Sequence, residues 1–205
     1  MDSTDAIPQL PEGYIKELKR AEARKADISK QIQKWFPSEA KILFEAGCGH
    51  GHWLTSYAME HPQQICLGID LIAGRVDKAN KKKDKRDLRD LHFLKAELGE
   101  LLETLPKRVT FDAVVFLFPD PWPKARHHKK RMIQSTLLEK LANRMESGGQ
   151  FYFRTDDRSY FDWTVEHLNE SKFWTINEDA DWLHEETTYF QNLMEGYFSV
   201  IAEVN

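Results

Sequence analysis

The segment Phe111–Phe118, with the sequence FDAVVFLF, constrains the fold more than any other part of the chain. A nearly continuous run of β-branched and aromatic residues is typical of a strand that is buried on both faces of a parallel sheet. Other short apolar segments alternate with helical patterns along the chain. This alternation predicts an α/β fold with a doubly wound, mostly parallel sheet.

The same patterns place the individual elements. The predicted strands are Lys41–Ala46, Gln64–Asp70, Leu91–Lys95, Phe111–Phe118, Gln150–Thr155, Phe173–Asn177 and Tyr197–Val204. The predicted helices are Tyr14–Trp35, His52–His61, Ala73–Arg89, Leu98–Leu105, Lys130–Met145 and Tyr160–Asn169. The last two strands are expected to form an antiparallel hairpin that closes a seven-stranded sheet.

The length of 205 residues suits one domain. We expect residues 14–205 to form it, beginning with an amphipathic helix, and residues 1–13, with two prolines and a glycine, to form a flexible arm. No apolar run approaches the roughly 20 residues that span a bilayer, and the first residues lack the pattern of a secretory signal. The sequence therefore predicts a cytoplasmic protein without a membrane partner.

Cys48 and Cys66 are the only cysteines. Two cysteines are too few for a disulfide framework, and they lack the His/Cys spacing of a zinc site. We therefore expect reduced thiols and no metal.

Charge is distributed unevenly along the chain. From Gln150 onward there are 12 acidic and 3 basic residues, a balance of −9, which leaves +5 on residues 1–149 when the net charge is −4. Such asymmetry indicates a face that binds phosphates, as in nucleic acid. The alternative is that the acidic part is only a solvated surface.

The strand Lys41–Ala46 leads directly into a glycine-rich turn, Gly47-Cys48-Gly49-His50-Gly51. Glycines let the backbone adopt positive φ and let a ligand approach the main chain, and the following helix presents free N–H groups. A dinucleotide-binding fingerprint would need a glycine where His52 stands. The pattern E-x-G-x-G-x-G, in which Glu45 is the acid, instead resembles motif I of class I S-adenosylmethionine-dependent methyltransferases.

Four carboxylates lie at or near the ends of the predicted strands. Asp70 lies 19 residues after Gly51, where an acceptor for a ribose diol belongs in this architecture. Glu45 faces the methionine end of the cofactor, orders the glycine turn, or is an exposed acid. Glu97 either bonds the adenine amino group or caps the next helix. The glycine turn, Asp70, Glu97 and Asp120, which follows the fourth strand, should converge at the carboxyl edge of the sheet, where ligands of such folds bind.

The segment Phe118–Arg131, FPDPWPKARHHKKR, combines a rigid Pro-Asp-Pro-Trp corner with a cationic tail. The prolines fix the backbone around Asp120, and Trp122 either stacks on an extruded base or packs in the core. The tail is expected to neutralise phosphates of a nucleic acid. His127 is the histidine that we expect to take part, whereas His128 is interpreted as a simple loop residue. The predicted phosphate-binding residues are Lys124, Arg126, His127, Lys129 and Arg131.

This segment resembles, almost letter for letter, the signature FPDPWPKxRHxKRR of the bacterial tRNA (guanine-N7-)-methyltransferases. The resemblance extends from about Lys41 to Gln191, and includes the glycine turn, Gly68-Ile69-Asp70, and Thr155-Asp156 followed by Tyr160. It implies a Rossmann-like methyltransferase fold that binds S-adenosylmethionine and releases S-adenosylhomocysteine. It also implies tRNA as the partner, methylated at N7 of guanosine 46 in the variable loop.

The resemblance assigns roles to matching positions. The implied cofactor-binding residues are Glu45, Gly47, Gly49, Gly51, Asp70, Glu97 and Asp120, of which Asp120 is also catalytic. Lys124 and Asp156 match substrate-binding positions, as do Thr188 and Gln191 in a C-terminal Thr-x-Phe-Glu motif. The chain departs from the family at Asp70, where Glu is usual, at Glu97, where Asp is usual, and at Gln191, where an amide replaces the carboxylate.

The chemistry expected at this corner needs little acid–base help. Guanine N7 has a free lone pair and no proton, so transfer to it requires positioning more than a general base. The product base is cationic, and Asp120 either stabilises the developing charge or accepts hydrogen bonds from the guanine N–H edge.

Two other functions remain open. The corner also resembles the D/N-P-P-Y/W corner of exocyclic-amino methyltransferases, although the order PDPW and the basic tail disfavour that assignment. A non-catalytic tRNA-binding protein is the second, because Gln191 lacks the usual carboxylate. The sequence is compatible with a monomer and with a homodimer.

Overall fold

The computed structural model describes residues 10–186 and 196–205. The strands are β1 (Ala40–Ala46), β2 (Ile65–Asp70), β3 (Leu91–Lys95), β4 (Val109–Leu117), β5 (Met145–Thr155), β6 (Trp174–Ile176) and β7 (Phe198–Val204). The α-helices are α1 (Glu12–Trp35), α2 (His52–Glu60), α3 (Ala73–Lys85), α4 (Leu98–Thr104), α5 (Ser135–Ala142) and α6 (Arg158–Asn169), and a 3₁₀ helix spans Ala125–Lys130.

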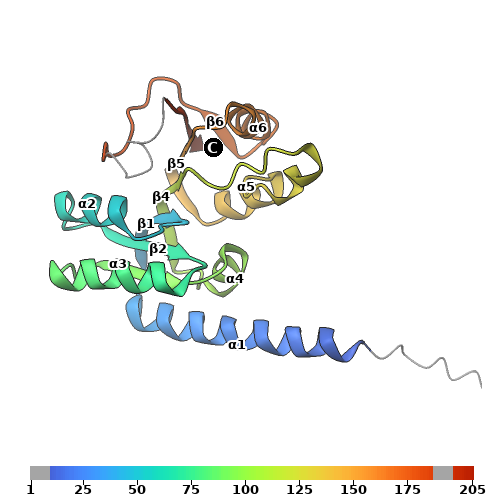
Figure 1. Cartoon of the computed structure of the whole chain (residues 1–205). Helices are drawn as coiled ribbons and strands as arrows, with labels where there is room; N and C mark the ends of the chain where they lie inside the picture. Colours follow the sequence, from blue (N-terminus) through green and yellow to red (C-terminus); the bar gives the residue numbers. More distant parts are fainter. Residues whose placement is uncertain (1–9, 187–195) are drawn as a thin grey trace, which may run out of the picture.

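Within the described residues, one sheet of seven strands runs in the order β3-β2-β1-β4-β5-β7-β6 (Figure 1). β1 to β5 pair in parallel, whereas β7 pairs antiparallel with both β5 and β6. The predicted doubly wound, mostly parallel sheet with an antiparallel C-terminal hairpin is confirmed. The chain order reverses beside β1, between β1 and β4, and ligands of such sheets bind outside the carboxyl ends of strands at this point.

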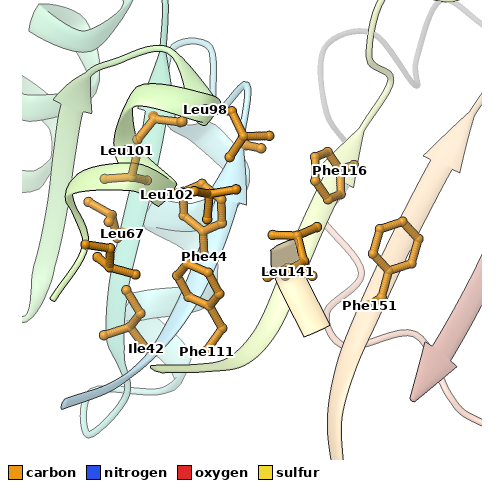
Figure 2. Packing of buried hydrophobic residues seen from close by; sticks show 14 of the residues in the cluster. Ile42, Phe44, Leu67, Leu98, Leu101, Leu102, Phe111, Phe116, Leu141 and Phe151 are labelled. Carbon is orange, nitrogen blue, oxygen red and sulfur yellow. The ribbon is translucent and has the colours of Figure 1, made fainter. Parts of the chain in front are cut away.

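The buried side chains form two clusters, one on each face of the sheet. Alternate residues of β1 supply both of them, because successive side chains of a strand point to opposite faces. Ile42 and Phe44 pack with side chains of α1, α4, α5 and α6, whereas Leu43 packs with side chains of α2 and α3. Figure 2 shows part of the first cluster, in which the rings of Phe44 and Phe111 stack 5.0 Å apart.

Helix α1 contacts the body mainly through its second half. Ile28 and Ile32 are its buried residues, and the Arg24 guanidinium forms an ion pair with Glu100 of α4 at 2.8 Å. The helix begins at Glu12, inside the predicted arm, and its first turns extend beyond the other elements (Figure 1). Among helices of the described ranges, none has the length and apolarity required to cross a bilayer.

The helix predicted over Lys130–Met145 is present as α5, but its predicted bounds are wrong at both ends. The chain instead follows an irregular path from Arg131 to Gln134, and β5 already begins at Met145. The backbone of Ile133 accounts for the difference, because its N–H donates to the Tyr160 hydroxyl and its carbonyl accepts from the Trp163 indole. These side chains of α6 take the groups that a continuous helix would have bonded internally.

Gly51 joins the glycine turn to α2. Its backbone conformation and its close neighbours both require a glycine at this position. Its φ is +67°, and a Cβ atom at this position would lie 2.6 Å from the Phe93 ring and 2.7 Å from the Ala79 Cβ. A left-handed backbone disfavours residues with a side chain, and both neighbours belong to the packed core. Gly51 therefore lets α2 pack closely against α3 and β3.

We predict that Gly51→Ala lowers the free energy of unfolding by about 3 kcal/mol, because it combines left-handed strain with overpacking. Gly74→Ala is the control, since Gly74 lies in α3 with no heavy atom within 4 Å of its added Cβ. That variant should gain roughly 0.5–1 kcal/mol from the better helix propensity of alanine. Urea unfolding followed by circular dichroism measures both, and equal effects would contradict the packing role of Gly51.

Candidate active site

A cleft of about 600 Å³ opens at the carboxyl edge of the sheet, beside the point where the strand order reverses. Its wall includes residues that follow or end four different strands. Gly47 comes after β1, Asp70 ends β2, Glu97 follows β3 and Asp120 follows β4. The predicted convergence of these four residues is thus found in the geometry, and the volume lies within the usual range for small-molecule sites.

Asp70 orders the glycine turn from the neighbouring strand. Its carboxylate accepts hydrogen bonds from the Gly49 N–H at 3.1 Å and from the Ile72 N–H at 2.8 Å. The Arg75 guanidinium lies 3.5 Å from the same side chain. Asp70 is only 6% exposed but lines the cleft, so its orientation is fixed before any ligand arrives.

Glu45 is the most unusual carboxylate near the turn. It lies on β1, is 3% exposed, and its Oε2 atom has no hydrogen-bond partner among the described residues. Burial, with a smaller contribution from the nearby Asp70 charge, raises the pKa of Glu45 to about 8. A buried acid without a partner is stabilised by any donor or cation that a ligand brings to it.

Glu97 caps α4 while lining the cleft. Its Oε2 atom accepts a hydrogen bond from the Glu100 N–H at 3.0 Å, as expected for an N-cap residue. The capping alternative is thus observed, and it is compatible with a further contact, because a carboxylate has several acceptor sites.

The Pro-Asp-Pro-Trp corner has a strained backbone on both sides of Asp120. Phe118 and Trp122 have φ of 48° and 45°, a region that residues with a side chain seldom adopt. Such strain is found at functional sites where surrounding contacts impose it. Here it exposes Asp120 at the mouth of the cleft, directly after the buried strand β4.

Arg131 supports the Pro-Asp-Pro-Trp corner from the protein interior. Its burial corrects its predicted role as a phosphate contact. The side chain is 2% exposed. Its guanidinium donates to the Pro121 carbonyl at 2.9 Å and to the carbonyl and hydroxyl of Ser159 at 3.1 and 3.0 Å. The ring of Tyr160 lies beneath it, at 5.0 Å. Arg131 therefore joins the corner to α6 and is not available to RNA.

The remainder of the cationic tail is accessible. Lys124, Arg126 and Lys129 are exposed on or beside the 3₁₀ helix. His127 is half-buried, with its ring 5.8 Å from that of Trp122. The tail thus presents exposed cations on one short segment, next to the cleft.

Sequence reasoning missed Lys130 as part of the cleft. Its ammonium lies 4.5 Å from the centre of the Trp122 ring, and Lys130 itself lines the cleft. Trp122 is half-buried at this rim and is not part of the core. The cleft is also lined by residues that the sequence did not single out, among them Arg75, Met132, Gln134, Thr136 and Lys140. Arg75 comes from α3, whereas the other four lie after the 3₁₀ helix, on or beyond an irregular path that no local pattern predicts.

The predicted substrate-binding residues near the C-terminus are only partly placed. Asp156 is exposed at the end of β5, beside Asp157, which caps α6 by accepting from the Tyr160 N–H at 2.7 Å. Thr188 and Gln191 lie outside the described residues.

Residues 39–197 match a protein family described as "Putative methyltransferase". The chain belongs to this family. A protein named tRNA (guanine-N(7)-)-methyltransferase from Magnetococcus marinus is 34% identical over 129 residues, which cover 62% of this chain and 51% of that protein. A protein of the same name from Yersinia pestis is 32% identical over 149 residues, with 72% of this chain and 62% of that protein covered. The chain thus spans little more than half the length of these family relatives.

Solved structures agree with the fold of the family. A structure described as an rRNA methylase from Streptococcus thermophilus has a TM-score of 0.55 and 14% identity, with 86% of this chain and 93% of that chain covered. At this identity the likeness supports the Rossmann-like methyltransferase architecture alone.

We predict that Glu45 lowers the free energy of unfolding of the ligand-free protein as the pH rises from about 5 to 8. Between the ordinary pKa of 4.5 and the folded-state pKa of about 8, the folded chain keeps a proton that the unfolded chain has lost. The unfolding free energy therefore decreases across this window, by an amount on the order of a few kcal/mol. Glu45→Gln, which resembles the protonated acid, should flatten the profile.

Thermal melts in buffers from pH 5 to 8 test this expectation. Glu39→Gln is the matched control, because Glu39 precedes the same strand but is exposed. An unchanged pH dependence in Glu45→Gln would show that other groups cause it.

Proposed function

We propose that the chain transfers a methyl group from S-adenosylmethionine to N7 of a guanosine in tRNA, the product being 7-methylguanosine. The observation that carries the proposal is the position of Asp120. Its exposed carboxylate lies in the same cleft as Gly47, Asp70 and Glu97, next to a segment of exposed cations. The names of the curated relatives agree with this substrate, and position 46 of the variable loop is the expected site. A tRNA substrate also fits the predicted cytoplasmic location.

The acids of the cleft fit this cofactor. Its adenosine offers hydroxyl and amino donors, and its methionine part offers an ammonium group. Asp70 and Glu97 both keep acceptor capacity at the cleft wall beyond their backbone contacts. Glu45 has a buried oxygen without a partner, which an ammonium group would satisfy. We assign the ribose to Asp70, the adenine to Glu97 and the methionine end to Glu45.

When bound, S-adenosylmethionine supplies an electrophilic methyl group on a sulfonium centre. Asp120 orients the guanine or stabilises the positive charge that develops on it, and no residue needs to remove a proton from N7. Trp122 offers a half-exposed ring at the rim for stacking on an extruded base. Lys130, above that ring, is a further cation close to the substrate phosphates.

The first test is mass spectrometry of nucleosides from unmodified tRNA after incubation with the protein and S-adenosylmethionine. We expect 7-methylguanosine, whereas a methyl group on an exocyclic amine would overturn the proposal.

Asp120→Asn should reduce turnover by about 100-fold or more while tRNA affinity is kept, since removal of one group that stabilises transition-state charge has effects of this size. Asp162→Asn, the same change at an exposed position of α6, should leave turnover unchanged. If the parent protein binds tRNA without turnover, it is a binding protein.

The second test separates phosphate contacts from the internal role of Arg131. The measurement is tRNA-binding titration at several salt concentrations. Lys124→Ala, Arg126→Ala and Lys129→Ala should each make the slope of the log association constant against log salt concentration less steep by about 0.7–0.9. Arg131→Met should leave the slope unchanged but lower the free energy of unfolding by about 2 kcal/mol, because its hydrogen-bond partners lose their donors. A reduced slope in Arg131→Met would return this residue to the RNA interface.

A further inference from the structure

Three side chains with metal-binding atoms meet at the C-terminal end of α2, away from the cleft. Glu60 and His61 come from the end of this helix, and His184 comes from the segment that follows β6. One ligand atom from each lies within 4.8 Å of the others. His184 is buried, whereas Glu60 and His61 are exposed, so the group is open to solvent on one side.

The hydrogen bonds around His184 determine which ring nitrogen carries a proton. The Ser56 hydroxyl donates its hydrogen to the Glu186 carboxylate at 2.9 Å. Ser56 Oγ also lies 3.1 Å from His184 Nε2, and since its hydrogen is already used, it must accept from this nitrogen. Nε2 therefore bears the hydrogen, and in the neutral imidazole the lone pair is on Nδ1.

That lone pair faces a carboxylate. His184 Nδ1 lies 3.5 Å from Glu60 Oε2, and two acceptors at this distance repel each other unless a cation or a second proton lies between them. Two ligands about 2.1 Å from a tetrahedral Zn²⁺ ion are about 3.4 Å apart. The spacing of this pair therefore suits a shared metal ion.

We propose that Glu60, His61 and His184 bind a divalent transition-metal ion of the zinc type. Two imidazoles and a carboxylate are typical ligands for such an ion, with the fourth position left to water. The Ser56–Glu186 pair would fix His184 as outer partners fix metal-binding histidines elsewhere. A proton on Nδ1 would satisfy Glu60 and His184 alone, whereas the metal also accounts for His61.

The surroundings favour a cation and hold the ligands in place. His61 is the C-cap residue of α2, and the C-terminal end of a helix carries partial negative charge. The ring of His61 stacks on Tyr57 at 4.2 Å. The Trp53 indole donates to the His184 carbonyl at 3.0 Å, which fixes the backbone of that ligand. A bound ion would thus connect the segment around His184 to α2.

The sequence predicts no metal site, because these ligands do not form a local cysteine or histidine spacing. The ligands here lie 123 residues apart, as the numbers of His61 and His184 show, and only the fold brings them together.

The test is isothermal titration calorimetry of the full chain, without an affinity tag and after removal of metals by a chelator. ZnCl₂ should bind with a stoichiometry of one ion per chain, and MgCl₂, a hard cation that prefers oxygen ligands, should not compete. His61→Ala, at an exposed position that the fold tolerates, should weaken Zn²⁺ binding by more than about tenfold, and Ser56→Ala by about tenfold.

His167→Ala is the matched control. His167 also follows a glutamate in the last turn of a helix, α6, and its removal should leave Zn²⁺ affinity unchanged. Absence of saturable binding, or equal affinity in His61→Ala and His167→Ala, would overturn the proposal and leave the Glu60–His184 contact as a salt bridge to a protonated histidine. Methyl transfer is measured separately, so failure of one proposal does not affect the other.

Discussion

The buried guanidinium of Arg131 is the interaction on which the mouth of the cleft depends. It joins the Pro121 carbonyl to the start of α6 at Ser159. Taking a charge out of water is unfavourable. The buried charge of Arg131 is tolerated here because each guanidinium nitrogen donates to a fixed oxygen. The contact with Pro121 helps to hold the left-handed backbone of the adjacent Trp122, whereas the Phe118 N–H donates to the Arg154 carbonyl. Asp120 is thereby presented on a rigid corner that a loop of average composition would not maintain.

A sheet whose parallel strands end together supplies the other half of the site. Asp70, Glu97 and Asp120 are far apart in the sequence, yet each ends or follows a strand. Their meeting required only that the strands be parallel and adjacent, which apolar patterns and strand lengths predict. The placement of these acids and of Gly47 at one edge of the sheet was predictable from the sequence for this reason.

Arg131 and Lys130 show why the remainder was not predictable. Both belong to a run of basic residues, and composition treats them alike. Three residues of α6, Ser159, Tyr160 and Trp163, form hydrogen bonds with Arg131 and Ile133. These bonds keep the Arg131 guanidinium in the protein interior. These are long-range contacts from α6, and helical propensity over Lys130–Met145 carries no information about them.

Helix α2 connects the two proposed sites through its opposite ends. Its N-terminus begins at Gly51 of the glycine turn, where free N–H groups give partial positive charge, and its C-terminus carries the opposite partial charge beside Glu60 and His61. Between them, Trp53 donates to the His184 carbonyl. The helix that follows the glycine turn therefore also contacts the segment of His184 and Glu186, the second of which accepts a hydrogen bond from Ser56. Because Glu60, His61 and His184 are not among the residues that line the cleft, a cation bound by them would add to the contacts on α2 without competing for the groups that form the cleft.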